Sequence, residues 1–384
     1  MINSVTLKNY RGLDELTVPL SKITMLTGTN GVGKTTILEG LYCLFSETKL
    51  DVSPLARYNR SIGVLFNQNA NNFAGFSARQ NYNYKLFWEE CPSYGKKDCT
   101  VEAKTKDNLL WSWKYKKASI SDLDKGLLVN NPIPIDSSTE FALWNWNTCG
   151  TIMEKSSHAK KSINEKYIRA QILSPDGGLY LLPPIVESTP ILSVCKYLDF
   201  ASIRMAPQKL SYEMSKRITE ALKIINPRVT DVRLTDVESG LLSIILDDKY
   251  SATLGTLGNG AVTWAGALMA IYEVIETLNV TSNSEMPILF LLDEMGVGIH
   301  YSTMLNVWKY IKDFSAKYPY MQFVFTSHSD DCVRAFCEAF LNSDEDMAKI
   351  VRLHKTVKDN KIITTEYSKE LFDNIISGDW EVRG

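Results

Sequence analysis

Residues 25–36 read Met25-Leu26-Thr27-Gly28-Thr29-Asn30-Gly31-Val32-Gly33-Lys34-Thr35-Thr36, which fits the phosphate-binding pattern G-x-x-x-x-G-K-[ST] at every constrained position. The apolar run 23–26 before it predicts a buried strand, and residues 36–45 predict the helix behind it. The three glycines allow the backbone to curl, so that N–H groups and a helix N-terminus face an anion. The stretch therefore predicts a strand–loop–helix unit of an α/β fold.

This loop also predicts a ligand. Lys34 is expected to reach the β- and γ-phosphates of a nucleoside triphosphate, and the Thr35 hydroxyl is expected to ligate Mg²⁺. A glycine-rich turn without any ligand is the alternative, which the flanking strand and helix disfavour. The other residues of the loop expected at the nucleotide are Asn30, Gly31, Gly33 and Thr36.

A second apolar run, residues 287–294, ends in the adjacent carboxylates of Asp293 and Glu294. Such a run is typical of a central parallel strand, and functional groups of these sheets lie at the carboxyl ends of strands. We expect Asp293 to hold Mg²⁺ and Glu294 to polarise the water that attacks the γ-phosphorus. An acidic pair at a strand end can also cap a helix, but together with the loop at 28–35 it indicates a nucleotide site.

Two further segments complete the predicted site. Residues 321–329 form a buried strand ending in a polar cluster, where His328 is expected to sense the γ-phosphate rather than to be merely structural. The glycine-rich stretch Gly258-Asn259-Gly260 precedes a helix that runs to about residue 277, and its N-terminus is a second candidate anion site.

Composition sets the outer bounds. The chain has 384 residues, 45% of them hydrophobic and 22% charged, with a formal net charge of −2. These are values of a globular protein of more than one subdomain, without general attraction to nucleic acid or membranes. The seven cysteines show no zinc spacing, and neither a signal peptide nor a membrane-spanning run is visible, so we expect reduced thiols and a cytoplasmic location.

The pattern along the chain predicts three segments. Residues 1–150 are expected to form an ATPase lobe with short strands at 5–7 and 16–18 and an antiparallel β region that includes 82–88, 100–103 and 109–115. Residues 151–230 are expected to be a helical insertion, with helices at 154–173 and 210–225. Residues 231–384 are expected to begin with a hairpin and to continue as a parallel α/β unit.

Taken together, these motifs resemble the ABC-type ATPases of the RecF/SMC-like group, and most closely the compact overcoming-lysogenization-defect-like ATPases of prokaryotic anti-phage defence. The resemblance rests on LKNYRGL at 7–13, the phosphate loop, LGNG at 257–260, LLDEMGVGIHYS at 291–302 and FTSHS at 325–329. It implies a P-loop fold of the ABC-ATPase type, with a mixed central sheet, an antiparallel β subdomain and a helical insertion. It covers roughly the first 45 and the last 180 residues, and no motif matches the middle segment.

The resemblance also implies how the site is assembled. ATP and Mg²⁺ would lie between two copies of the chain in a homodimer or higher even oligomer, with Gly258, Asn259 and Gly260 of one copy capping the nucleotide of the other. Arg11 matches an early arginine that contacts nucleotide, and residues 298–300 match the loop between protomers. The sequence departs from the family pattern at two points. Residue 258 is a glycine where transporter ATPases have a serine, and no single residue can be assigned as the Q-loop glutamine, for which Gln68 and Gln80 are the candidates.

The target of the ATPase is less determined. Aromatic and basic residues alternate at 111–117 and a basic stretch spans 155–169; both fit nucleic-acid contact, but a half-buried strand and a solvated helix face are favoured. No nuclease constellation is visible, so destructive chemistry would come from an effector protein, a nuclease or toxin encoded nearby. A sensor or scaffold that controls such an effector is favoured, a DNA-repair ATPase that clamps nucleic acid is the alternative, and a transporter subunit is disfavoured.

Overall fold

The computed structural model describes residues 1–45, 90–106, 110–118, 140–153, 160–173, 179–181, 185–186, 194–199, 210–236, 241–278, 288–344 and 346–378. The strand expected at 82–88 and the Q-loop candidates Gln68 and Gln80 lie outside these residues. No helix in the described ranges is long and apolar enough to cross a membrane. The chain divides into two compact units, which consist of Met1–Leu20, Thr35–Cys195 and Lys355–Thr364, and of Ser21–Lys34, Lys196–His354 and Thr365–Gly384.

The first unit contains an eight-stranded sheet among the described residues and the helix α1 (Lys34–Phe45), except for Lys34, which ends the segment Ser21–Lys34 of the second unit. Its strands, in sheet order, are β2 (Leu13–Pro19), β1 (Ile2–Tyr10), β4 (Asp98–Thr105), β5 (Leu110–Ala118), β6 (Glu140–Met153), β7 (Lys160–Leu173) and β8 (Leu179–Leu181), and β9 (Ile185–Val186) pairs with β7. The strands expected at 5–7, 16–18, 100–103 and 109–115 are confirmed.

The alternation of aromatic residues on β5 reflects burial on one side of the sheet. Trp111, Trp113 and Tyr115 are at most 8% exposed, whereas Lys114 between them is exposed and pairs with Asp98. A strand places successive side chains on opposite faces, so the rings belong to the core. The interpretation of this run as a half-buried strand is confirmed for the residues up to 115.

The prediction of a helix at 154–173 is wrong, because residues 160–173 form the strand β7. This strand pairs antiparallel with β6 in an unbroken register from Glu140 opposite Leu173 to Met153 opposite Lys160. Helix propensity is a weak local preference, and long-range backbone pairing of this length overrides it. The second expected helix is confirmed as α5 (Tyr212–Lys223).

The second unit is built on a six-stranded sheet in the described residues. Its strands, in sheet order, are β10 (Val194–Asp199), β14 (Ile288–Asp293), β15 (Met321–Thr326), β3 (Ile23–Thr27), β16 (Ala348–Lys355) and β17 (Ile362–Tyr367). The pairs β14–β15, β15–β3 and β3–β16 are parallel. Every residue of β3, β14 and β15 is buried, as expected for the central strands of an α/β sheet.

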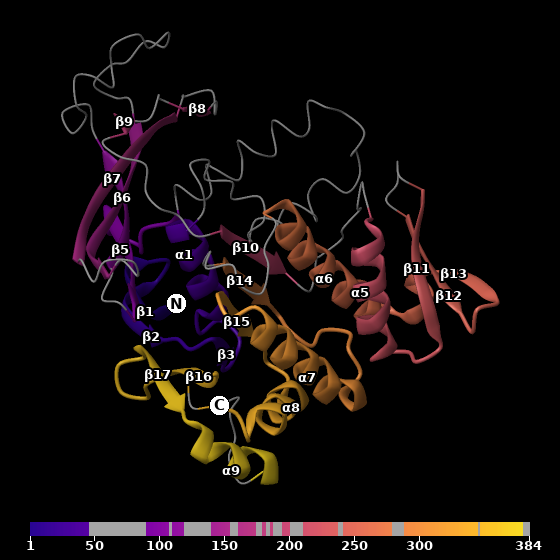
Figure 1. Ribbon diagram of the computed structural model, residues 1–384. Helices are drawn as coiled ribbons and strands as arrows, with labels where there is room; N and C mark the ends of the chain where they lie inside the picture. Colours follow the sequence, from indigo (N-terminus) through magenta and orange to yellow (C-terminus); the bar gives the residue numbers. More distant parts are fainter. Residues whose placement is uncertain are drawn as a thin grey trace. The chain divides into compact units, whose positions relative to one another are not determined.

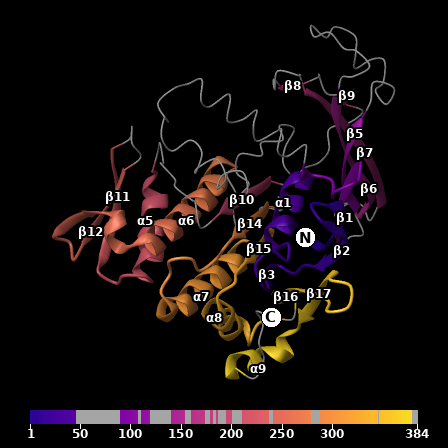
Figure 2. The same cartoon turned by 180° about the vertical axis from the view of Figure 1, so that it is seen from behind.

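Helices of this unit bury aromatic side chains against the sheet. Besides α5, the described helices of this unit are α6 (Asn259–Thr277), α7 (Tyr301–Lys317), α8 (Asp330–Phe340) and α9 (Phe372–Ser377), with 3₁₀ turns at Leu254–Leu257 and Lys369–Leu371. The fully buried Trp308 of α7 packs edge-on against Phe325 of β15 and Phe336 of α8, and its indole N–H donates to the Cys332 carbonyl. Accordingly, α7 and α8 lie side by side in both ribbon views (Figures 1 and 2).

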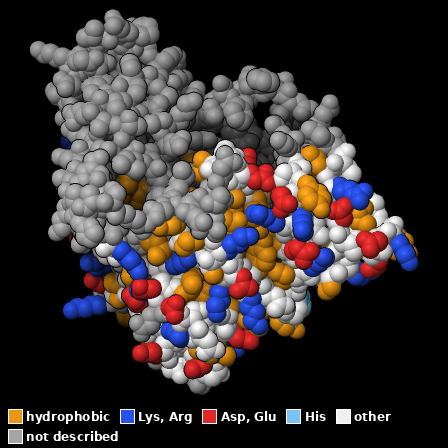
Figure 3. Space-filling view, viewed as in Figure 1, with side chains coloured by type: hydrophobic (Ala, Val, Ile, Leu, Met, Phe, Trp, Pro, Cys, Tyr) orange, Lys and Arg blue, Asp and Glu red, His pale blue; other side chains and the backbone are white. Residues whose placement is uncertain are grey.

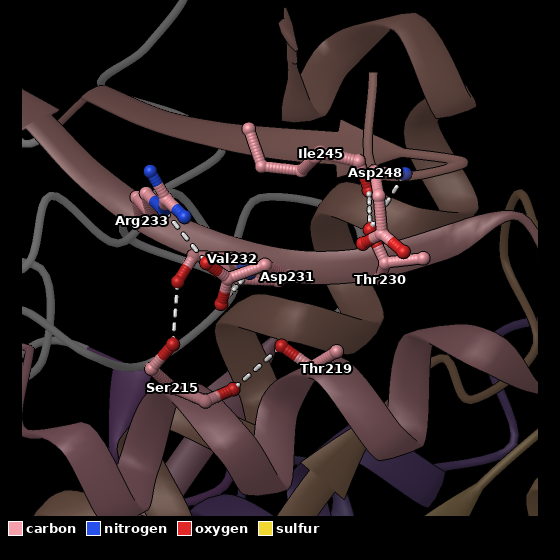
Figure 4. Close-up of polar contacts among 8 residues, drawn as sticks. All are labelled: Ser215, Thr219, Thr230, Asp231, Val232, Arg233, Ile245 and Asp248. Atoms are coloured by element: carbon pink, nitrogen blue, oxygen red, sulfur yellow. Dashed lines mark hydrogen bonds and ion pairs between the residues drawn. The ribbon is translucent and has the colours of Figure 1, made fainter. Parts of the chain in front are cut away.

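A smaller three-stranded sheet of β11 (Val229–Asp236), β12 (Leu241–Leu246) and β13 (Tyr250–Thr253) packs beside α5. The antiparallel pairing of β11 and β12 confirms the expected hairpin. Figure 4 shows how hydroxyl groups link these elements. Ser215 of α5 donates to the Val232 carbonyl at 2.5 Å, and Thr230 donates to the Ile245 carbonyl of β12 at 3.2 Å.

The start of α6 lies against the turn that follows β14. A Cβ atom built on Gly260 would be 2.1 Å from the carbonyl oxygen of Gly298. Gly298 itself has φ +77°, and a Cβ atom built on it would lie 3.0 Å from the backbone nitrogen of Gly260. Two backbones in such contact leave no room for a side chain, so glycine at 260 is a steric requirement of this chain.

We predict that Gly260→Ala lowers the thermal unfolding temperature, because overpacking costs about 1–3 kcal/mol where neighbouring atoms must move. Gly255→Ala is the matched control, since a Cβ there meets nothing within 4 Å. Thermal denaturation followed by circular dichroism measures both. Equal unfolding temperatures for the two variants would contradict the close approach of residues 260 and 298.

Candidate functional site

The phosphate loop follows β3 and contains three glycines with a positive φ angle, a backbone conformation that residues with a side chain rarely adopt. Gly28 has φ +132°, Gly31 has φ +77° and Gly33 has φ +95°. A Cβ on Gly28 would lie 2.2 Å from the Leu353 carbonyl oxygen of β16, so this glycine also permits close contact between strands. Gly31 and Asn30 are exposed, which leaves this part of the curled backbone accessible to a ligand. The loop thus has the backbone conformation that its sequence predicts.

Lys34 folds back over the loop. Its ammonium group donates to the carbonyl oxygens of Gly28 at 2.7 Å and Thr29 at 2.9 Å. Burial lowers the pKa of Lys34, and the carboxylates of Asp293 and Glu294 act in the opposite direction and raise it. The lysine and the acidic pair are therefore close enough to interact electrostatically, although 259 positions separate residues 34 and 293 in the sequence.

Parallel pairing explains this proximity. Thr326, at the end of β15, is in register with Leu26 of β3, and Leu292 of β14 is opposite Phe325. The carboxyl ends of the three strands consequently meet at one edge of the sheet, where ligands of open α/β sheets bind. The expected position of Asp293 and Glu294 beside the phosphate loop agrees with this register.

Asp293 has no exposed surface, and other side chains donate hydrogen bonds to both of its carboxylate oxygens. Thr326 Oγ1 donates to Oδ1 at 2.5 Å, and the Tyr197 hydroxyl donates to Oδ2 at 3.0 Å. An ionised carboxylate offers about four acceptor positions, which is more than these two hydrogen bonds occupy. In nucleotide sites Mg²⁺ uses one or two carboxylates together with phosphate and water oxygens, and Asp293 fits this requirement.

Glu294 adopts a left-handed backbone conformation with φ +59°, which costs a non-glycine residue about 1–2 kcal/mol. Its N–H donates to Thr326 Oγ1 at 2.8 Å, and the next residue, Met295, donates its N–H to the Thr326 carbonyl. Such conformations persist where surrounding bonds enforce them, and they concentrate at functional sites. The side chain of Glu294 is only partly buried, as its expected role with water requires.

His328 is exposed and follows the carboxyl end of β15. The preceding residue, Ser327, donates its N–H to the Leu26 carbonyl, directly before the phosphate loop. His328 therefore belongs to the same strand edge as Lys34 and Glu294. Its predicted function as a γ-phosphate sensor stays a prediction.

Three predicted nucleotide contacts, Arg11, Thr35 and Thr36, belong to the first unit. Thr35 is half-buried and Thr36 is buried at the start of α1, directly after Lys34 in the chain. The Arg11 side chain is 1% exposed and forms an ion pair with Glu39, whose side chain is fully buried. A nucleotide contact by Arg11 stays a prediction, and it would require this buried side chain to become exposed.

The glycine-rich stretch before α6 divides into two parts. Gly258, with φ +89°, and Asn259 are exposed, whereas Gly260 is buried against Gly298. Gly258 and Asn259 are accessible to a second molecule, so these two residues could contact a nucleotide bound to another copy of the chain, as predicted. Gly260 contributes to the packing within its own chain.

Tyr197 and Thr326 are site residues that the sequence analysis missed. Thr326 ends a buried strand immediately before the polar cluster, and a hydroxyl at that position is a signal for the site edge. Tyr197 lies within β10 in the stretch VCKYLD, which carries no recognisable motif. Only the sheet order, in which β10 neighbours β14, reveals its role.

Comparison with known proteins identifies the family. The model of the AAA ATPase domain family matches residues 1–333. No curated protein matches the sequence. The solved structure of the recombination mediator protein RecF is similar at a TM-score of 0.37 and 10% identity, covering 95% of this chain and 98% of that one. Because the family model spans most of the sequence, including the phosphate loop and the Asp293–Glu294 pair, the chain belongs to the AAA ATPase domain family.

Proposed function

We propose that this protein binds ATP with Mg²⁺ at the edge formed by β3, β14 and β15 and hydrolyses it to ADP and phosphate. The observation that supports this most is the parallel register of β14, β15 and β3, whose carboxyl ends bring Asp293 and Glu294 to the edge of the sheet that carries Lys34. A cation for phosphate, a buried carboxylate for a metal ion and a partly exposed carboxylate for water are thereby combined in one unit. These are the groups that phosphoryl transfer requires.

Each residue has a separate task in this proposal. Lys34 neutralises charge on the β- and γ-phosphates, and the curled loop donates backbone N–H groups to them. Asp293 holds Mg²⁺, which when bound neutralises charge on the phosphates. Glu294 accepts a proton from the attacking water, and His328 donates a hydrogen bond to the γ-phosphate.

We further propose that two copies close around ATP, with the exposed Gly258 and Asn259 of one copy covering the nucleotide of the other. A ligand held by two surfaces stabilises the closed state by its extra affinity for that state. Loss of the γ-phosphate contact after hydrolysis then favours opening. Homodimerisation and ATP binding are therefore linked in this proposal.

We propose that the biological role of the ATP-driven dimer is that of a sensor or scaffold that controls an effector protein. This proposal follows from the resemblance of the sequence to defence ATPases. The described residues give little support to nucleic-acid clamping, because the rings of Trp111, Trp113 and Tyr115 are buried in the sheet. Basic and acidic side chains are also interspersed over the described part of the face in Figure 3.

We predict that Lys34→Ala weakens ATP binding about 100-fold or more, since hydrogen bonds to charged groups contribute roughly 1.5–3 kcal/mol each. Isothermal titration calorimetry with ATP in the presence of Mg²⁺ measures the affinity of each variant for ATP. Lys309→Ala on the exposed surface of α7 is the control for loss of one positive charge. Unchanged affinity in Lys34→Ala would refute the assignment of the phosphate loop.

We predict that Glu294→Gln binds ATP like the parent but releases phosphate about 100-fold or more slowly, because a general base contributes about 10²–10⁴-fold. With ATP the variant should also accumulate as a dimer in light scattering. Glu273→Gln, at an exposed position of α6, keeps the parent rate. Hydrolysis at the parent rate would show that Glu294 does not activate water, and a monomer with bound ATP would contradict the dimer.

We predict that the protein co-purifies with the product of an adjacent gene when the two are co-expressed, also after nuclease treatment of the extract. The Lys34→Ala variant should lose this ATP-dependent association. Salt-sensitive binding of DNA by the purified protein alone, without any associated effector, would instead favour the nucleic-acid clamp.

A further inference from the structure

The hydrogen bonds around Asp293 come from the two strands that flank β14. Tyr197 belongs to β10 on one side, and Thr326 belongs to β15 on the other. Asp293 has no exposed surface, Thr326 is 1% exposed and Tyr197 is 5% exposed, so water does not replace these contacts. A buried charge without partners is costly, and the direction of a buried carboxylate is set by the donors that hold it.

Thr326 also joins Asp293 to Glu294. Its hydroxyl donates to Asp293 and accepts the backbone N–H of Glu294 at 2.8 Å. The neighbouring backbone is held in addition, because the Ser327 hydroxyl donates to the Met295 carbonyl at 2.9 Å. One hydroxyl therefore connects the metal-binding carboxylate to the left-handed peptide that carries the water-activating carboxylate.

We propose that Tyr197 and Thr326 are positioning residues of the ATPase site. Tyr197 orients the Asp293 carboxylate for Mg²⁺, and Thr326 orients both Asp293 and the backbone of Glu294. The inference rests on the proposed ATPase function. Each hydroxyl occupies one acceptor position of one carboxylate oxygen and so fixes the direction in which that oxygen can meet a cation.

A purely structural role for Tyr197 has different consequences. The ring is buried regardless of what the hydroxyl does, and phenylalanine preserves the ring. A structural role therefore predicts an effect on unfolding alone. A positioning role predicts a change in the Mg²⁺ requirement, because partners of metal ligands alter metal affinity about 10–100-fold.

The first test compares the Tyr197→Phe variant with the parent protein. Mg²⁺ is titrated into a fixed concentration of each protein and of a fluorescent ATP analogue, and nucleotide binding is measured. We expect the Mg²⁺ concentration for half-maximal nucleotide binding to rise about 10-fold or more. Binding in the presence of a chelator should equal that of the parent. Tyr310→Phe is the matched control, because it removes a tyrosine hydroxyl that bonds to Tyr272 at 2.6 Å, away from Asp293.

The second test compares Thr326→Val with Thr326→Ser. Valine has the shape of threonine without the hydroxyl, so it should raise the Mg²⁺ requirement and also lower kcat at saturating Mg²⁺. Serine retains the hydroxyl and should restore both quantities to within a few-fold of the parent. Thermal unfolding of each variant separates these effects from loss of the fold.

The outcomes distinguish this inference from the proposal on which it rests. If the parent shows no Mg²⁺-dependent nucleotide binding, the proposed function fails and the inference fails with it. If the parent shows this dependence and both Tyr197→Phe and Thr326→Val keep the parent Mg²⁺ requirement, the positioning roles alone are overturned. Failure of serine to restore kcat would likewise overturn the role of Thr326.

Discussion

The buried carboxylate of Asp293 is the constraint on which the site depends. An ionised group with no exposed surface is tolerated only when hydrogen bonds and nearby charges compensate for the lost water. Two hydroxyls from the flanking strands bond to its two oxygens, and Lys34 interacts with its charge. The order β10–β14–β15–β3 brings all of these groups together, so the sheet topology and the chemistry of the site are inseparable.

Close backbone contacts give the site its second constraint. Gly28 lies against Leu353 of β16, and Gly260 lies against Gly298 in the turn after β14. No side chain separates the backbones at either point. Since packed interiors deform little, a displacement of the turn at 294–298 must be accommodated by the start of α6. This connects the residue proposed to activate water with the exposed Gly258 and Asn259 proposed to meet a second copy.

Local sequence patterns predicted the second unit well. The phosphate loop, β3, β14, β15 and α6 follow from apolar runs, glycines and charged residues at strand ends, each of which depends on neighbours in the sequence. The prediction was wrong for residues 160–173, which contain helix-forming Lys, Glu, Gln and Ala and yet pair with β6 over their whole length. Pairing between distant segments is a tertiary property that local propensity does not contain.

The same distinction applies to the candidate site. Lys34, Asp293 and Glu294 belong to motifs whose spacing is local, and the strand register brings these motifs to one edge of the sheet. Tyr197 has no such motif, and its importance depends on the position of β10 beside β14. Arg11 was expected at the nucleotide from resemblance alone, whereas the structure buries it in an ion pair with Glu39.

The most direct measurement is a crystal structure of the protein with Mg²⁺ and a non-hydrolysable ATP analogue. The account predicts the β- and γ-phosphates at Lys34 Nζ and the curled loop, with Mg²⁺ next to Asp293 and the Glu294 carboxylate facing the γ-phosphorus. A nucleotide bound elsewhere, or a phosphate loop occupied while Asp293 and Glu294 face away from it, would contradict the account.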